Sequence, residues 1–254
     1  MAAVICATAI FYISADMRAD ETFDNNLAAQ YATEATEPPE RAADGAEGID
    51  PPLTPSSSLR VDFEALRAYN EDTIGWVYQR DTKISYPVVQ TTNNSLYLDK
   101  RFDGESTERG CIFADYRHDV SDSNVLILYG HNVSRRTQTQ FSSLVFYLED
   151  PDYIKTHPSF EFYDAATGEC KTYDVFSVFM ADVSTQESAD RYYKDVSDDE
   201  YADYLSFIAG ESIYDTGIVP TADQKTLIFS TCVTGRYEVR CLIVCIERAP
   251  RMDA

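Results

Sequence analysis

Short apolar runs alternate with polar turns along most of the chain. The runs are rich in Val, Ile, Tyr and Phe, the residue types that pack best in β-strands. They are GWVYQ (75–79), ISYPVVQ (84–90), GCIFAD (110–115), NVLILYG (124–130), SFEFYDA (159–165), KTYDVFSVFMADV (171–183), KTLIFSTC (225–232) and EVRCLIVCIE (238–247). About eight strands with a few helices at their connections predict a mainly β fold, specifically a closed β-barrel.

Three segments have a helical pattern instead. The first is VDFEALRAYN (61–70), where Asp62 is a candidate N-cap. The second covers about residues 140–156 and places three leucine and valine side chains on one face. The third follows Ser197, which opens a Ser-Asp-Asp-Glu capping box, and is expected to end at Gly210 in a left-handed cap.

The first residues of the chain differ from the rest. Residues 2–15 carry no charge, but a bilayer-spanning helix needs ~20 apolar residues, and no basic residues precede this segment. A buried core helix is one interpretation. Because polar sequence follows, we prefer a truncated signal anchor at residues 1–15. This anchor predicts a location at the cell membrane, with the folded domain extracellular.

Residues 16–58 are rich in Pro, Ala, Ser and acidic residues, a composition that cannot bury enough apolar surface to order itself. They predict a stalk or linker, followed by a folded domain at residues 59–254. The formal net charge of −22 leaves no basic surface to displace counterions from phosphates, and nucleic acid is therefore excluded as a partner.

Two apolar runs end in residues that can carry chemistry. NVLILYG leads directly to His131, and KTLIFSTC ends in Cys232 before a turn. Taken alone, each residue is more often structural. A thiol nucleophile needs a proton partner, however, and two rigid strand ends can hold such a pair in place. His118 and His157 lie in predicted loops without a paired motif, and we interpret them as structural or surface residues.

An arginine is the third candidate, because the oxyanion formed when a thiolate attacks an amide needs charged N–H donors. Arg240 lies in the strand that follows Cys232. If Arg240 faces the site, strand alternation turns Cys241 and Cys245 away from it, so these two are expected to be packing residues. Arg236 has the same parity, and parity leaves this choice open. The sequence contains no cluster with metal-ligand spacing, and neither a metal nor a cofactor is expected.

The combination of YGHN (129–132), STC (230–232) and a following strand arginine resembles the sortases, membrane-anchored cysteine transpeptidases of Gram-positive bacteria. The resemblance extends further. Residues 70–117 are similar to the first half of a class B sortase, with NEDTIGW, TKISYPV and GCIF in the expected order. The predicted helices near residues 140–156 and after Ser197 also match class B. The similarity covers about residues 60–248.

The resemblance implies a closed eight-stranded sortase-type β-barrel with peripheral helices, an N-terminal helix and a long helix before the last strand pair. It implies that Cys232 is the nucleophile, that His131 protonates the leaving amine and that Arg240 stabilises the oxyanion. Arg240 is chosen over Arg236 because the family places this arginine at the start of the last strand. The positions of Ser230, Asn94 and Leu98 match residues that line the substrate groove in class B sortases.

The implied activity is cleavage of a C-terminal sorting signal after Thr, in a motif of the Asn-Pro-x-Thr-Asn/Gly type. A thioester forms on Cys232 and is resolved by an amine. The expected partners are secreted proteins that carry the signal, a peptidoglycan precursor or pilin amine, and the membrane through the N-terminal anchor. A pilus-polymerising sortase and a non-catalytic surface-binding domain remain alternatives. A papain-type protease is disfavoured, because in that family the cysteine precedes the histidine and lies on a helix.

Overall fold

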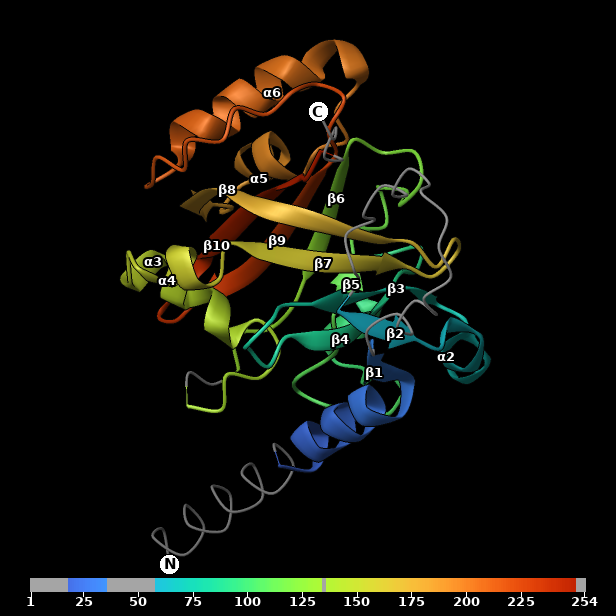
Figure 1. The fold of residues 1–254 in the computed structure, drawn as a ribbon. Helices are drawn as coiled ribbons and strands as arrows, with labels where there is room; N and C mark the ends of the chain where they lie inside the picture. Colours follow the sequence, from blue (N-terminus) through green and yellow to red (C-terminus); the bar gives the residue numbers. More distant parts are fainter. Residues whose placement is uncertain (1–17, 36–57, 134–135, 250–254) are drawn as a thin grey trace, which may run out of the picture.

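The computed structural model describes residues 18–35, 58–133 and 136–249. Its centre is a closed barrel with the strand order β10-β8-β7-β3-β4-β5-β6-β9 (Figure 1). The β4–β5 and β6–β9 pairs are parallel, and the other neighbours are antiparallel. The strands are β3 (Thr73–Tyr78), β4 (Ser85–Val89), β5 (Phe113–Ala114), β6 (Val125–Tyr129), β7 (Ser159–Asp164), β8 (Cys170–Asp182), β9 (Thr226–Val233) and β10 (Arg236–Glu247). The predicted mainly β fold with a closed eight-stranded barrel is confirmed.

The apolar strands β6 and β9 lie next to each other and are buried on both faces. Leu126 and Leu128 point into the core inside the barrel, whereas Val125 and Ile127 belong to a second core outside it. Strand β9 alternates in the same way, with Phe229 inside and Ile228 outside. Burial on both faces explains why these runs are apolar throughout instead of alternating with polar residues.

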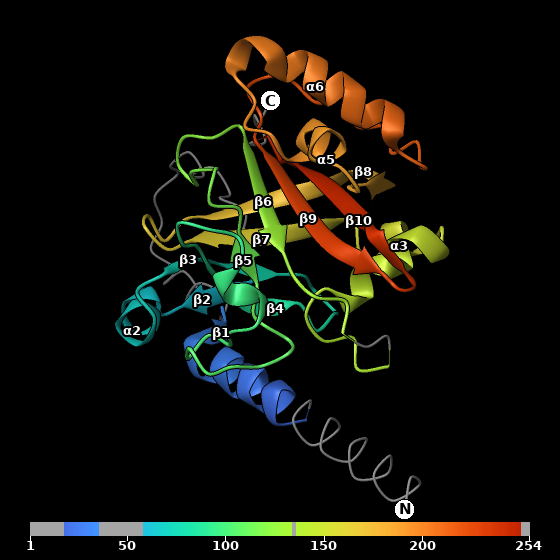
Figure 2. The same cartoon turned by 180° about the vertical axis from the view of Figure 1, so that it is seen from behind.

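Helices α5 and α6 cover the outer face of β8, β9 and β10 (Figures 1 and 2). Their tyrosine, leucine and isoleucine side chains complete the second core, and the long helix before the last strand pair is thereby confirmed. The helices are α2 (Phe63–Tyr69), α3 (Phe146–Glu149), α4 (Tyr153–Thr156), α5 (Gln186–Tyr193) and α6 (Asp198–Glu211), with short 3-10 turns η1 (Leu96–Leu98) and η2 (Ser142–Val145).

The predicted helix ends agree with the structure in part. The side chain of Asp62 accepts a hydrogen bond from the Ala65 N–H at 3.0 Å and caps α2 as expected. The helix predicted at residues 140–156 is instead η2, α3 and α4 in succession, and Pro151 interrupts it because proline cannot continue a helical hydrogen-bond pattern. Helix α6 continues through Gly210 and ends at Glu211, with Ser212 as an extended C-cap residue, so the predicted left-handed cap at Gly210 is wrong.

Residues 18–31 form an N-terminal helix that packs against the barrel (Figure 1). Leu27 shares a core with Trp76, and Asp24 pairs with Arg109 at 3.0 Å. The helix continues into β1 (Ala32–Glu34), which pairs with β2 (Leu59–Val61). This part of the predicted stalk therefore belongs to the folded domain, which begins before Leu59. Residues 36–57 of the predicted stalk lie outside the described residues.

The predicted anchor at residues 1–15 also lies outside the described residues. Within the described ranges, the structure contains no helix with both the length and the apolar character needed to cross a membrane. The described residues therefore do not support the predicted cell-membrane location through a single N-terminal anchor, and that prediction is corrected to this extent.

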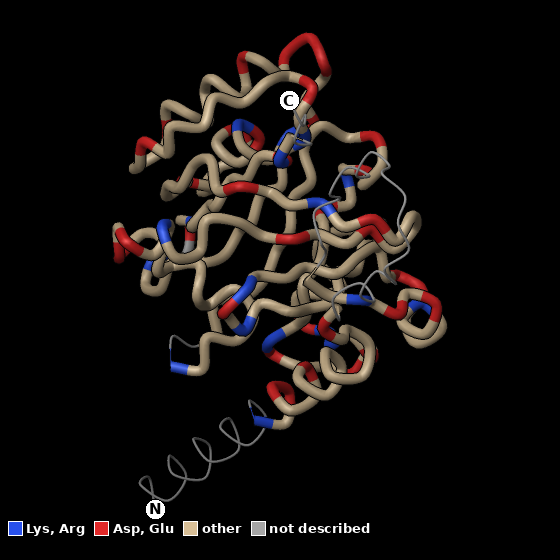
Figure 3. The backbone as a smooth tube through the Cα atoms, viewed as in Figure 1, with Lys and Arg blue, Asp and Glu red and all other residues tan. Residues whose placement is uncertain are grey.

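Acidic residues are spread over the surface of the part that the structure describes, including α6 and the N-terminal helix (Figure 3). Several of those near the barrel's lower end are paired with arginines: Asp20 contacts Arg101 at 3.2 Å, and Arg101 also pairs with Asp103. These ion pairs join the N-terminal helix to the segment between β4 and β5, which lies beside the candidate site.

Candidate active site

Strands β6 and β9 bring the histidine and the cysteine to the same end of the barrel. Because the two strands are parallel and Tyr129 pairs with Ser230, the residues that follow each of them leave the barrel together. Gly130 makes this exit possible. A Cβ atom at this position would lie 2.5 Å from Ile112 Cδ1, closer than real contacts allow, so another residue would push the strand end away.

A cavity of about 310 Å³ lies at this exit. It brings together every residue that the sequence predicted for the site: Cys232, His131, Arg240, Ser230, Asn94 and Leu98. Its wall also includes Phe113, Tyr129, Gly130, Val183, Ala189, Tyr193 and Thr231. The cavity therefore combines a thiol, an imidazole and a guanidinium with an apolar lining, which suits an extended peptide.

Cys232 differs from the other cysteines that the structure describes. Cys241 and Cys245 are fully buried inside the barrel, and burial raises the pKa of both thiols well above the usual range. Burial raises the pKa of Cys111 in the same way, and it raises the pKa of partly buried Cys170 to about 12. These thiols stay protonated, and only a thiolate is an effective nucleophile. Cys232 is partly exposed and lines the cavity.

His131 is held in place by one hydrogen bond of its ring and one of its backbone. Its ring Nε2 lies 2.9 Å from the carbonyl oxygen of Leu98, and its backbone N–H donates to Gln140 Oε1 at 3.2 Å. A carbonyl oxygen can only accept, so Nε2 carries the hydrogen in this arrangement. In the neutral ring, Nδ1 is then the acceptor atom.

The register of the last two strands separates the two candidate arginines. Arg240 pairs directly with Cys232 and lines the cavity, with its Nη1 donating to the Val239 carbonyl oxygen at 3.2 Å. Arg236 is exposed, and its Nη1 lies 3.8 Å from the sulfur of Met180. An irregularity in the pairing between Arg236 and Arg240 breaks the alternation that made the two equivalent in the sequence.

Beyond Arg240, the strand alternates as predicted. Cys241 and Cys245 face the interior of the barrel, whereas Leu242 and Val244 face α5 and α6. The prediction that Cys241 and Cys245 are packing residues is confirmed by their complete burial in apolar surroundings.

Tyr193 is a residue of the site that the sequence reasoning missed. It ends α5, and its hydroxyl lies 2.8 Å from Ser230 Oγ at the cavity wall, where burial raises its pKa to about 12. The helix escaped notice because QESADRYY has few apolar residues. The sequence feature that could have predicted this helix is the capping box of Thr185 and Ser188, in which each side chain accepts a hydrogen bond from the backbone N–H of the other residue.

One wall of the cavity is held in place by residues before β5 and by a buried carboxylate after this strand. Asn94 Oδ1 accepts from the Tyr116 N–H at 3.0 Å, and Leu98 is 44% exposed at the cavity mouth. Tyr129 donates to Asp115 Oδ2 at 2.8 Å. Burial alone would raise the pKa of Asp115, but hydrogen bonds from Arg117 and Tyr129 outweigh it and hold that pKa at about 2. The Asp115 carboxylate therefore stays charged near neutral pH and holds the Tyr129 side chain in the cavity wall.

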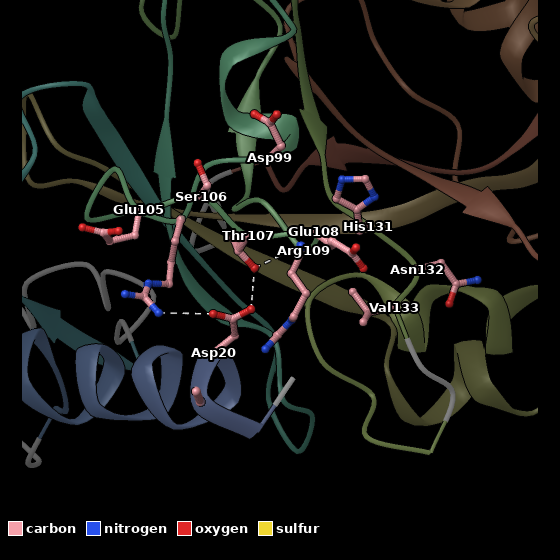
Figure 4. Close-up of a pocket in the computed structure, with 12 residues that line it drawn as sticks. Asp20, Asp99, Glu105, Ser106, Thr107, Glu108, Arg109, His131, Asn132 and Val133 are labelled. Carbon is pink, nitrogen blue, oxygen red and sulfur yellow. Dashed lines mark hydrogen bonds and ion pairs between the residues drawn. The ribbon is translucent and has the colours of Figure 1, made fainter. Parts of the chain in front are cut away.

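A second cavity, of about 930 Å³, borders His131 (Figure 4). It lies between the N-terminal helix and residues 99–109, and its lining is mostly charged or polar. Asp20 accepts hydrogen bonds from Arg101 and Thr107, and Asp99 and Glu108 line the same cavity as His131 (Figure 4). His131 therefore borders two different environments. Within the described ranges, no group of three or more His, Cys, Asp or Glu side chains is arranged to hold a metal ion.

Comparison with known proteins identifies the family. No family model matches the chain. The chain is 30% identical over 189 residues to Sortase B of Listeria monocytogenes, a match that covers 72% of each protein. The chain belongs to the class B sortases. It is also 31% identical over 193 residues to Sortase B of Staphylococcus aureus, with 75% of each covered.

The solved structures agree with this assignment. The structure of the Staphylococcus aureus sortase B–substrate complex has a TM-score of 0.65 and 26% identity to this protein, covering 74% of this chain and 85% of that one. As a class B sortase, the protein is a sortase-type cysteine transpeptidase. The resemblance that the sequence motifs indicated is confirmed over the barrel and its peripheral helices.

Proposed function

We propose that this sortase cleaves a C-terminal sorting signal after Thr, holds the product as a thioester on Cys232 and transfers it to an amine of the peptidoglycan. One observation carries the proposal: the thiol of Cys232, the imidazole of His131 and the guanidinium of Arg240 line a single peptide-sized cavity at the ends of adjacent strands. A sortase B–substrate complex is known for the Staphylococcus aureus relative, which supports binding of a substrate by this fold.

The first half-reaction forms the thioester. The Cys232 thiolate attacks the threonine carbonyl carbon, and the carbonyl electrons move to oxygen. Arg240, directly opposite Cys232 in the β9–β10 pair, donates N–H groups to this oxyanion. The intermediate collapses as the C–N bond breaks, and His131 gives a proton to the departing amine. The sorting-signal fragment leaves, and the acyl group stays on sulfur.

The second half-reaction reverses these roles. An acceptor amine that has given up its ammonium proton to solvent attacks the thioester carbon and passes a second proton to His131, and the C–S bond breaks to release the Cys232 thiolate. The result is one amide exchanged for another, with no oxidant or metal consumed. The same histidine must therefore meet the leaving amine first and the acceptor amine afterwards.

The second cavity offers the acceptor its own approach to His131. Asp99 and Glu108 are exposed and line this cavity with the histidine (Figure 4). A primary amine arrives as a cation near neutral pH, and exposed carboxylates raise the local concentration of cations in a manner that salt weakens. We infer that the sorting signal occupies the cavity at Cys232 and that the amine enters from the acidic side.

Replacing both carboxylates, with Asp99→Asn and Glu108→Gln, is expected to raise the KM for the amine about two- to fivefold, because exposed charge pairs are weak. Hydrolysis of the sorting peptide without amine should stay unchanged. The matched control is Glu187→Gln with Asp203→Asn, two exposed carboxylates on α5 and α6. Steady-state kinetics at varied amine concentration measure the effect. An unchanged KM, or an equal change in the control, contradicts the inference.

The proposed function is tested by intact-protein mass spectrometry. The purified chain is mixed with a panel of sorting-signal peptides of the Asn-Pro-x-Thr-Asn/Gly type, without amine. A mass gain equal to the peptide's N-terminal part, released by hydroxylamine, is the expected result. Adding an amine acceptor should convert the adduct into an amide product. A folded protein with a reactive thiol that forms no adduct with any peptide of the panel would contradict the proposed signal.

A further inference from the structure

We propose that Asn132 is a positioning residue, whose side-chain amide holds the strand end of His131 in register with Cys232. Asn132 Nδ2 donates to the carbonyl oxygen of Cys232 at 3.0 Å and lies 3.4 Å from Thr234 Oγ1. The amide thus spans from the residue after the histidine to the backbone of the cysteine itself. This role rests on the proposed functions of Cys232 and His131.

Backbone bonds hold the two strands together only up to Ser230. The β6–β9 register ends with the pair Tyr129 and Ser230, and the Gly130 N–H donates to the Ser230 carbonyl oxygen at 3.3 Å. Beyond this point, side chains take over. Thr231 Oγ1 donates to the Gly130 carbonyl oxygen at 2.8 Å, and the Asn132 amide adds the next bond. Side-chain hydrogen bonds therefore hold the two segments together beyond the end of the strand pairing, to the level of Cys232.

The opposite side of the histidine segment is fixed by a different part of the chain. Asn132 forms an isolated β-bridge with Gln140, and the Phe141 N–H donates to the His131 carbonyl oxygen at 3.2 Å. These bonds hold the segment against residues 140–141 and do not reach Cys232. The hydrogen bond from the Asn132 amide, by contrast, joins this segment to Cys232 itself. Without this bond, each of the two segments would keep its other hydrogen bonds, but the distance between His131 and Cys232 would no longer be fixed.

Such a bond affects the chemical steps more than peptide binding. Both half-reactions need the His131 nitrogen at proton-transfer distance from a group attached to the Cys232 acyl carbon. A displacement of about 1 Å at such a site can cost ~100-fold in rate. The peptide instead contacts the cavity wall, which Asn132 does not line. The structure therefore predicts a lower kcat at nearly constant KM when the amide is removed.

The test compares three variants by steady-state kinetics with the sorting peptide. Asn132→Leu keeps the branched shape without the donor, and its kcat should fall about tenfold, with KM changing less than about twofold. Asn132→Gln keeps an amide and should recover part of the loss. Thr234→Val removes the other acceptor of the same amide and should match the wild type, since Thr234 is exposed and outside the cavity.

The outcomes separate this inference from the proposed function. If the wild type forms the thioester and Asn132→Leu turns over equally fast, the positioning role is wrong and the function stands. If kcat falls equally in the Leu and Gln variants, or KM rises as much as kcat falls, the amide bond is not the cause, and the inference is also wrong. If thermal unfolding shows that Asn132→Leu does not fold, Asn132→Ser, which is too short to reach Cys232, replaces it with the same expected loss.

Discussion

Cys232→Ala is expected to abolish the thioester adduct and to lower turnover of a sorting peptide by about 10⁴-fold or more, because no other thiol in the part of the chain that the structure describes lines the cavity. The remaining cysteines among the described residues cannot substitute for it. Cys111, Cys241 and Cys245 are buried in the cores with raised pKa values and do not line the cavity. Turnover and intact mass are measured on the same protein preparation.

Cys170→Ala is the matched control for this experiment. Cys170 is partly exposed like Cys232, but it does not line the cavity, and burial and nearby Glu161 hold its pKa at about 12. The control should form the adduct at the wild-type rate. Transpeptidation that survives in Cys232→Ala, or that disappears in Cys170→Ala, would show that the nucleophile has been misassigned.

Arg240→Ala is expected to lower kcat/KM by about 10²- to 10³-fold, the usual effect of removing an oxyanion donor. The reason is geometric, because Arg240 is the direct strand partner of Cys232 and lines the same cavity. Arg240→Lys should recover only part of the loss, since lysine keeps the charge but not the planar set of donors. The measurement is kcat/KM for a sorting peptide, with kcat and KM resolved.

Arg236→Ala provides the control, because it removes the same charge from the same strand. Arg236 is exposed, contacts Met180 and does not line the cavity, so its removal should change kcat/KM less than about twofold. The reverse result is a large loss in Arg236→Ala with activity kept in Arg240→Ala. It would show that Arg236, and not Arg240, stabilises the oxyanion. It would also require the β9–β10 connection to fold differently in solution.

The barrel, and the meeting of the candidate residues in one cavity, could be predicted from the sequence because the relevant signals are local. Strands β6 and β9 are continuous apolar runs that end in His131 and Cys232, and burial on both faces produces such runs directly. Alternation on β10 correctly turned Cys241 and Cys245 inward. The choice between Arg236 and Arg240 was beyond this reasoning, because a pairing irregularity that no residue pattern announces shifts the parity between them.

The parts that the sequence missed depend on partners far away in the chain. The N-terminal helix looks like part of an acidic linker, and its acids make sense only beside Arg101 and Arg109, which follow some eighty residues later. Helix α5 is similar, because only its last two tyrosines are buried. The local sequence contains no sign of such long-range contacts, and these contacts decide the structure against the local preference.

The position of β9 in the barrel also bears on how the protein matures. Strand β9 lies between β6 and β10, and β10 closes onto β8, so the final hairpin fills the gap between two strands formed much earlier in the chain. Until that hairpin inserts, β6 and β8 expose unpaired edges, and such long-range pairing is slow. The thiol and its opposing arginine arrive on the same hairpin. On the proposed mechanism, a chain in which this hairpin has not yet inserted is expected to be inactive towards peptides.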